Sequence, residues 1–129
     1  MRTYRPRTAA EALRAIERGE SPWLATGEFL DDFYRATPEE KRRLVEEPPP
    51  PVRNPENHRW AAYLAAAVDY LAWKNAFDPP AWVGRPEYIL PEPWFLREDW
   101  RFRAWLLFKT PPAFLVRNIF CGDRELDRV

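Results

Sequence analysis

Apolar residues in the first third of the chain recur every three or four positions, the spacing that gathers side chains on one face of a helix. A polar residue that can cap a helix precedes each run, because the first turn of a helix leaves backbone N–H groups without partners. Two of the three runs also begin with proline, which fits the first helical turn. The pattern predicts three helices before residue 48, each beginning after one of the caps Thr8, Ser21 and Thr37.

The longest nearly apolar segment follows the start signal Asn54-Pro55-Glu56 and predicts a helix over residues 55–77. Large apolar residues mark one face of it, and alanines fill most of the remainder. A helix that is apolar almost all round is a buried one. We therefore predict that this is the central helix of the fold, with a main face formed by Trp60, Leu64, Val68 and Leu71.

Proline divides the rest of the chain into short segments. The run Pro48–Pro51 cannot be helical and predicts a polyproline connector over residues 48–54. Residues 84–95 contain too many prolines for regular structure and predict an ordered loop held by its aromatic side chains. The order polar residue, Pro, Pro, Ala, aromatic occurs at residues 78–82 and again at 110–114. Each copy predicts a helical turn with its aromatic ring turned inward.

Residues 98–109, EDWRFRAWLLFK, fit two patterns. The spacing of Phe102, Trp105 and Leu106 fits a helix, and Glu98 and Asp99 would lie in its first turn. Alternating apolar positions also fit a strand, and of the two we favour the helix.

The chain of 129 residues has the length of one domain and can form a core without disulfides. The sequence therefore predicts a single all-α domain, residues 1–129, of five to seven helices. Its parts are the N-terminal helices (1–47), the connector (48–54), and the central helix with a C-terminal segment wrapped over it (55–129).

Charge and hydropathy narrow the classes of function. The 20 basic and 20 acidic residues balance, whereas nonspecific nucleic-acid and membrane-surface binders carry a positive excess. The longest nearly apolar run, Trp60–Trp73, contains Asp69 and is too short to span a bilayer. No secretory signal is visible, and the single cysteine excludes an internal disulfide. We expect a cytoplasmic protein.

The sequence shows no catalytic, metal or phosphate motif. Its single histidine and single cysteine, His58 and Cys121, are far apart, and its four glycines are scattered. No catalytic residue, metal ligand or cofactor is therefore assigned. We expect His58 to be a surface or capping residue and Cys121 to be a small buried side chain.

Two aspartates are predicted to be buried polar groups. Asp32 lies among aromatic residues, and we expect it to pair with Arg35 or Arg14. Asp69 is the one charge inside the predicted central helix. An unpaired buried carboxylate is costly, so we expect Asp69 to bond to an arginine or an indole N–H.

Aromatic and arginine residues are the strongest functional signal. The chain has 7 Trp, 5 Tyr and 8 Phe, and we expect one or two tryptophans on a binding surface. Tryptophan, tyrosine and arginine dominate the residues that contribute most to protein–protein binding. The predicted contact surface consists of Trp94, Phe95, Arg117, Asn118 and Phe120. The polar side chains of Arg117 and Asn118 need partners either within the fold or on another molecule.

Several segments together resemble a family of short bacterial proteins of unknown function. They are GEFLDDF, PAWV with EPWF, and PPAF with RNIF, within a likeness that covers about residues 21–123. The resemblance implies an accessory or antitoxin-like protein whose partner is another bacterial protein, such as a toxin-like enzyme encoded nearby. It carries over no catalytic residue. Some antitoxins carry an N-terminal DNA-binding domain; we expect the segment before residue 21 to be too short for one, which argues against autoregulation.

Other functions stay open at this point. One is a small enzyme whose pocket gathers Asp31, Asp32, His58, Asp69 or Cys121. Another is weak nucleic-acid binding through arginine, although the acids of the predicted second helix would repel phosphate. Self-association into a homo-oligomer is also compatible with the sequence. The leading hypothesis is a non-enzymatic protein that binds another protein.

Overall fold

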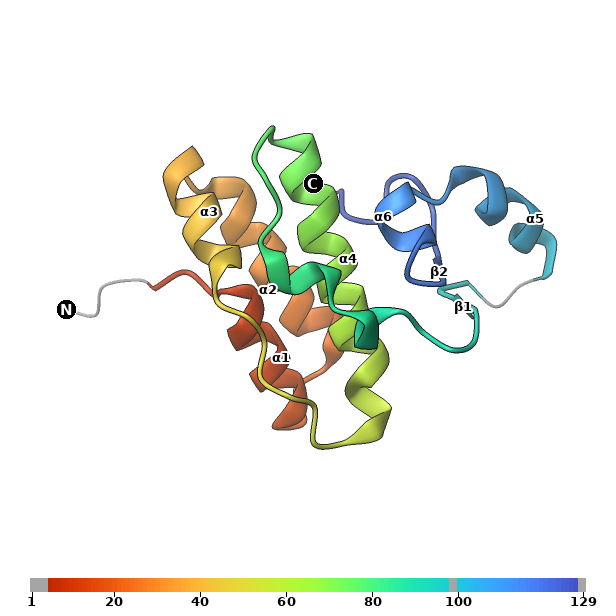
Figure 1. Ribbon diagram of the computed structural model, residues 1–129, viewed down its shortest axis with the longest axis horizontal. Helices are drawn as coiled ribbons and strands as arrows, with labels where there is room; N and C mark the ends of the chain where they lie inside the picture. Colours follow the sequence, from red (N-terminus) through yellow and green to blue (C-terminus); the bar gives the residue numbers. More distant parts are fainter. Residues whose placement is uncertain (1–4, 98–99, 128–129) are drawn as a thin grey trace.

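A computed structural model describes residues 5–97 and 100–127 and has the predicted all-α architecture. Helices α1, α2 and α3 pack with the longer α4, and the C-terminal third of the chain extends from one side of α4 with α5 farthest out (Figure 1). In chain order, the elements are α1 (Ala9–Glu17), α2 (Pro22–Arg35), α3 (Pro38–Glu46), η1 (Pro55–Asn57), α4 (His58–Lys74), η2 (Ala81–Gly84), η3 (Pro86–Tyr88), β1 (Trp94–Phe95), α5 (Trp100–Lys109), α6 (Pro112–Leu115) and β2 (Ile119–Phe120).

The three predicted N-terminal helices are confirmed, and two of their three caps act as predicted. The Thr8 hydroxyl accepts a hydrogen bond from the Glu11 amide at 3.0 Å. Thr37 and Glu40 form a reciprocal capping box at the start of α3. Ser21 differs from the prediction, because its side chain makes no capping bond and α2 begins simply with Pro22.

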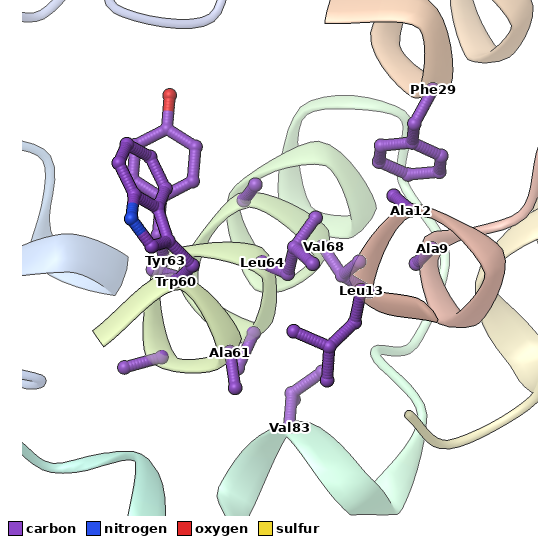
Figure 2. Packing of buried hydrophobic residues seen from close by; sticks show 14 of the residues in the cluster. Ala9, Ala12, Leu13, Phe29, Trp60, Ala61, Tyr63, Leu64, Val68 and Val83 are labelled. Carbon is purple, nitrogen blue, oxygen red and sulfur yellow. The ribbon is translucent and has the colours of Figure 1, made fainter. Parts of the chain in front are cut away.

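Helix α4 is the predicted central helix. It starts after the single 3-10 turn η1, and its large apolar residues and alanines are buried. Figure 2 shows Leu13 of α1 packed between Leu64 and Val68 of α4 and Val83 of η2. Since alanine side chains are short, α1 and the η2 turn approach the α4 backbone closely.

The C-terminal end of α4 contains a residue in a left-handed conformation. Ala76 has φ 58°. The Phe77 amide donates to the Ala72 carbonyl at 3.0 Å, and the Ala76 amide donates to the Trp73 carbonyl at 3.2 Å. This is the bonding of a Schellman motif, whose left-handed position is usually glycine because a Cβ is disfavoured there.

Replacing Ala76 with glycine is therefore expected to raise the free energy of unfolding by about 0.5–1 kcal/mol. Urea unfolding should show a higher midpoint with an unchanged slope. Gly19, with φ +101°, provides the reverse control, since Gly19→Ala should lower the midpoint. A lower midpoint for Ala76→Gly would show that its left-handed backbone is not the source of strain.

The C-terminal third is held by a short parallel pairing that the sequence did not predict. Trp94 pairs with Ile119 and Phe95 with Phe120. The Leu96 amide extends the pairing by donating to the Phe120 carbonyl at 3.0 Å. The predicted proline-rich loop thus contains one strand, β1, as well as the buried ring of Tyr88.

Residues 100–109 form a helix, α5, which confirms the favoured alternative. The predicted first-turn acids Glu98 and Asp99 lie outside the described residues. Both Pro-Pro-Ala turns are helical, and their rings, Trp82 and Phe114, are buried as predicted. The residues that precede these turns as N-caps are prolines, so neither turn is capped by a side chain.

Candidate functional site

Arg117 lies directly after α6, and its guanidinium joins three parts of the fold. It donates to the Val83 carbonyl of η2 at 2.8 Å, to the Asp69 carboxylate of α4 at 3.0 Å, and to the Ala113 carbonyl of α6. Its side chain is 6% exposed. Asp69 therefore has the arginine partner that was predicted, although its own side chain is only partly buried.

Asn118 is also bonded within the fold. Its φ is 67°, a left-handed value that asparagine tolerates better than most residues. Its side-chain amide donates to the Leu90 carbonyl at 3.1 Å. The partners that Arg117 and Asn118 need are therefore supplied by the chain itself.

The three aromatic residues of the predicted contact surface pack against neighbouring rings. Trp94 meets Trp60 edge-on, with ring centres 5.0 Å apart, and the Arg59 guanidinium lies 4.9 Å from the Trp94 ring centre. Phe95 stacks on Phe120 at 4.6 Å. Trp94 and Phe95 are half-buried and Phe120 is buried.

These positions limit the part of the predicted contact surface that another protein could reach. Arg117 and Phe120 are buried in the free chain and cannot belong to an exposed surface. Helix α6 packs against α4, and β1 meets α4 through the ring of Trp94. Trp94, Phe95 and Asn118 are half-buried. Through their contacts within the chain the five residues attach the C-terminal third to the helical bundle, and we call them the internal frame.

Asp32 has a structural position in α2. Its carboxylate is buried, accepts from the Arg7 amide at 2.8 Å and pairs with Arg35 at 3.0 Å. Of its two predicted partners it therefore meets Arg35, whereas Arg14 pairs with Glu47 at 3.1 Å. The bonds to Asp32 tie the segment before α1 to α2.

The residues of the rival enzyme hypothesis do not converge on one pocket. Asp32, Asp69 and His58 line different surface hollows. Asp31 lies half-buried beside Asp32 on α2, and Cys121 is buried near α6. Within residues 5–97 and 100–127, no three His, Cys, Asp or Glu side chains are grouped to hold a metal ion.

The predicted burial of Cys121 is confirmed, and its surroundings make it unreactive. It is 1% exposed. Burial, with a smaller effect from the nearby Glu125 charge, raises the pKa of the Cys121 thiol far above its ordinary range. Because the thiolate is the nucleophilic form of cysteine, this thiol is a poor nucleophile at neutral pH. The Cys121 amide donates to the Thr110 hydroxyl at 3.1 Å, which fixes the end of α5 to the chain after β2.

Glu125 is a carboxylate whose burial makes stability depend on pH. Burial raises its pKa above the ordinary value of 4.5, while a hydrogen bond from the Tyr63 hydroxyl at 3.3 Å and the Arg97 charge oppose the shift. As pH rises, the Glu125 carboxyl loses its proton near pH 4.5 in the unfolded chain but at a higher pH in the folded chain. The raised pKa therefore makes unfolding more favourable as pH rises from 4.5 to the folded-state pKa.

Replacing Glu125 with glutamine is expected to remove this decrease in the free energy of unfolding with rising pH. The free energy of unfolding of the variant minus that of the wild type should grow from pH 4 upward and level off once the folded-state carboxyl has ionised. Urea unfolding at pH 4, 5, 6 and 7 measures the difference, with the exposed Glu92→Gln as the control. A difference that shrinks with rising pH would contradict this assignment.

Large apolar side chains are exposed along α5 and α6, where the sequence analysis placed no contact residue. Phe108 is 88% exposed, and four more are between 44% and 61% exposed. Leu106, by contrast, is fully buried and holds α5 to the rest of the chain. We call this group the α5–α6 surface; it consists of Trp105, Leu107, Phe108, Leu115 and Val116.

The sequence contained one signal of this surface. Seven of the ten residues of α5 are apolar, and they are spread around the helix rather than gathered on one face. A helix of that kind is either enclosed by its own chain or open to another molecule. Figure 1 shows α5 as the element farthest from the bundle, and its residues Trp105, Leu107 and Phe108 are exposed.

Comparison with known proteins gives no match from which a function could be transferred. No protein-family model, curated protein or solved structure matches this chain. No helix in the described part of the chain is both long enough and apolar enough to cross a membrane.

Proposed function

We propose that this chain is a non-enzymatic bacterial protein that binds another protein through the α5–α6 surface. The observation that carries the proposal is the exposure of Phe108, with Leu107 and Val116 exposed by more than half. Burying apolar side chains against a partner is favourable in proportion to the area removed from water. Grouped exposed apolar residues mark interaction sites.

The internal frame supports the proposal because it holds one end of this surface in place. Phe114 is fully buried on the inner side of α6, and Arg117 bonds α6 to α4 and η2. The Thr110 hydroxyl links the end of α5 to Cys121. A surface that is ordered before binding loses less conformational entropy when the partner arrives.

The motif resemblance suggests what kind of partner to seek. Relatives of that kind look antitoxin-like, so the form of the function we favour is a cytoplasmic protein that covers a toxin-like enzyme encoded by a neighbouring gene. Net charge zero fits a surface that binds mainly by apolar burial rather than by attraction to phosphate.

Site-specific cross-linking in the native host tests the proposal. A photoreactive benzoylphenylalanine in place of Phe108 is expected to capture one defined protein. The same group in place of Leu24, which is 54% exposed on α2, should not capture it. Absence of a product from position 108, or the same product from both positions, would contradict the proposal.

Phe108→Ser gives the matching quantitative prediction. Because Phe108 is almost fully exposed, the substitution should change the free energy of unfolding by less than about 0.5 kcal/mol. Loss of a central aromatic contact should weaken binding of the captured protein by about tenfold or more. Calorimetric titration of the purified pair measures this, and unchanged affinity would place the contact elsewhere.

A further inference from the structure

A small hollow lies between the C-terminal half of α4 and the start of α6. Its volume is about 310 Å³, and its lining consists of Asp69, Tyr70, Trp73, Pro112 and Ala113. We call it the Asp69 hollow. Aromatic rings, a proline and an alanine form most of its wall, and Asp69 is the one charged residue among these five.

Trp73 stands at the rim of the Asp69 hollow and contributes little to the core. It is 75% exposed, and its ring centre lies 6.0 Å from that of Tyr70. Asp69 and Trp73 are four residues apart on α4 and so lie on the same face of the helix. An exposed indole beside a carboxylate on one helix face presents both an aromatic surface and a negative charge.

The Asp69 carboxylate can still accept hydrogen bonds toward the hollow. Its Oδ2 bonds to Arg117, whose guanidinium is almost fully buried and also bonds to two carbonyls. The Asp69 side chain is itself 30% exposed. Among the described residues, none donates a hydrogen bond to its Oδ1. An ionised carboxylate can accept about four hydrogen bonds, so Asp69 can accept more.

The chemistry of the wall favours a hydrogen-bond donor that can also stack on an aromatic ring. Because Arg117 already neutralises the Asp69 charge, the hollow offers a carboxylate oxygen that can accept hydrogen bonds rather than a net negative charge. A carboxylate or phosphate has no proton to donate to this oxygen at neutral pH, and an apolar side chain would remove water from Asp69 without replacing its hydrogen bonds. Aromatic faces attract cations, and the Lys74 ammonium already lies 5.7 Å from the Tyr70 ring centre. A planar guanidinium can stack on an indole and donate to a carboxylate at once, whereas an ammonium is a more strongly hydrated point charge.

We propose that the Asp69 hollow binds an arginine side chain of the partner protein. This inference rests on the proposed function, because it takes the arginine from the protein that covers the α5–α6 surface. Pro112 and Leu115 are three residues apart on α6, so the hollow and that surface meet on one helical turn. One partner segment can therefore contact both.

Fluorine NMR of the full chain labelled with 5-fluorotryptophan tests the inference. The Trp73 signal is assigned as the one missing from Trp73→Phe. Acetylarginine amide is expected to shift this signal in a saturable way. Acetylcitrulline amide has nearly the same shape without the charge, and it should bind about tenfold more weakly, which corresponds to losing one charge-assisted interaction. Equal responses to both amides, or no saturable shift, would overturn the inference.

Three variants locate the binding. Asp69→Asn should abolish the preference for arginine over citrulline, and the signals of the other tryptophans report whether this variant is folded. Ala113→Leu fills the hollow, leaves the bond between Asp69 and Arg117 in place, and should abolish the Trp73 shift. Arg42→Ala, in the neighbouring hollow, should leave the titration unchanged. If Ala113→Leu still binds the arginine amide normally, the hollow is not the site.

The cross-linking experiment tests the proposed function and this titration tests the arginine inference, so a negative outcome of one can be told from a negative outcome of the other. A partner captured at position 108 without arginine binding at Trp73 would overturn this inference and leave the proposed function standing. Arginine binding without any captured partner would overturn the proposed function and, with it, the assignment of the arginine to a partner protein.

Discussion

Arg117→Ala is expected to lower the free energy of unfolding by about 3–5 kcal/mol, the cost of removing the buried member of an ion pair. The guanidinium is 6% exposed and bonds to Asp69, Val83 and Ala113. Its loss would leave two carbonyls and a carboxylate without their donor. For a domain of this size the loss is a large share of the total stability.

Urea unfolding followed by circular dichroism measures the effect, with Arg124→Ala as the matched control. Arg124 has an 88% exposed side chain, so its substitution should change the free energy of unfolding by less than about 0.5 kcal/mol. Arg117→Lys should recover only part of the loss, because an ammonium cannot reproduce the planar fork of a guanidinium. A cost below about 1 kcal/mol for Arg117→Ala would instead support the surface role predicted from the sequence.

Tyr63→Ala is expected to have a similar effect, about 3–5 kcal/mol, through the cavity it leaves. Tyr63 is 2% exposed, and its ring lies between 5.6 and 6.3 Å from four other rings. Those rings come from α2, α4, β1 and α6, so Tyr63 joins the bundle to the C-terminal third. The four rings are Trp23, Trp60, Trp94 and Phe114.

Tyr63→Phe separates the ring from the hydroxyl. It keeps the ring and removes the hydroxyl that bonds to Glu125, so a loss of about 1 kcal/mol is expected. Urea unfolding of both variants under the same conditions gives the comparison. Equal losses for the two substitutions would mean that the hydroxyl, rather than the aromatic packing, accounts for the stability at this position.

The N-terminal helices and α4 could be predicted because their signals are local. Thr8, Thr37 and the prolines that follow caps identify helix starts within a few residues, and the alanine-rich surface of α4 indicates burial on all sides. The partner of Asp69 was predicted by type, since a carboxylate in an apolar helix needs a donor. That this donor is Arg117 could not be predicted, because 48 residues separate Arg117 from Asp69 in the sequence.

The β1–β2 pairing and the α5–α6 surface could not be predicted for different reasons. Two-residue strands are too short to show an alternating pattern, and their pairing depends on distant parts of the chain. An apolar helix such as α5 has the same pattern whether its own chain or another molecule covers it. Composition pointed to aromatic and arginine residues as a contact surface, but it could not distinguish residues that pack within the chain from residues that are exposed.

Hydroxyl-radical footprinting of the chain alone tests most directly whether residues 117–120 are internal while α5 faces outward. Comparing phenylalanines with one another removes differences in intrinsic reactivity. The structure predicts rapid modification of Phe108, which is 88% exposed, and strong protection of Phe114 and Phe120, at 0% and 9%. Modification of Phe120 at the rate of Phe108, or protection of Phe108 in the monomeric chain, would contradict the account.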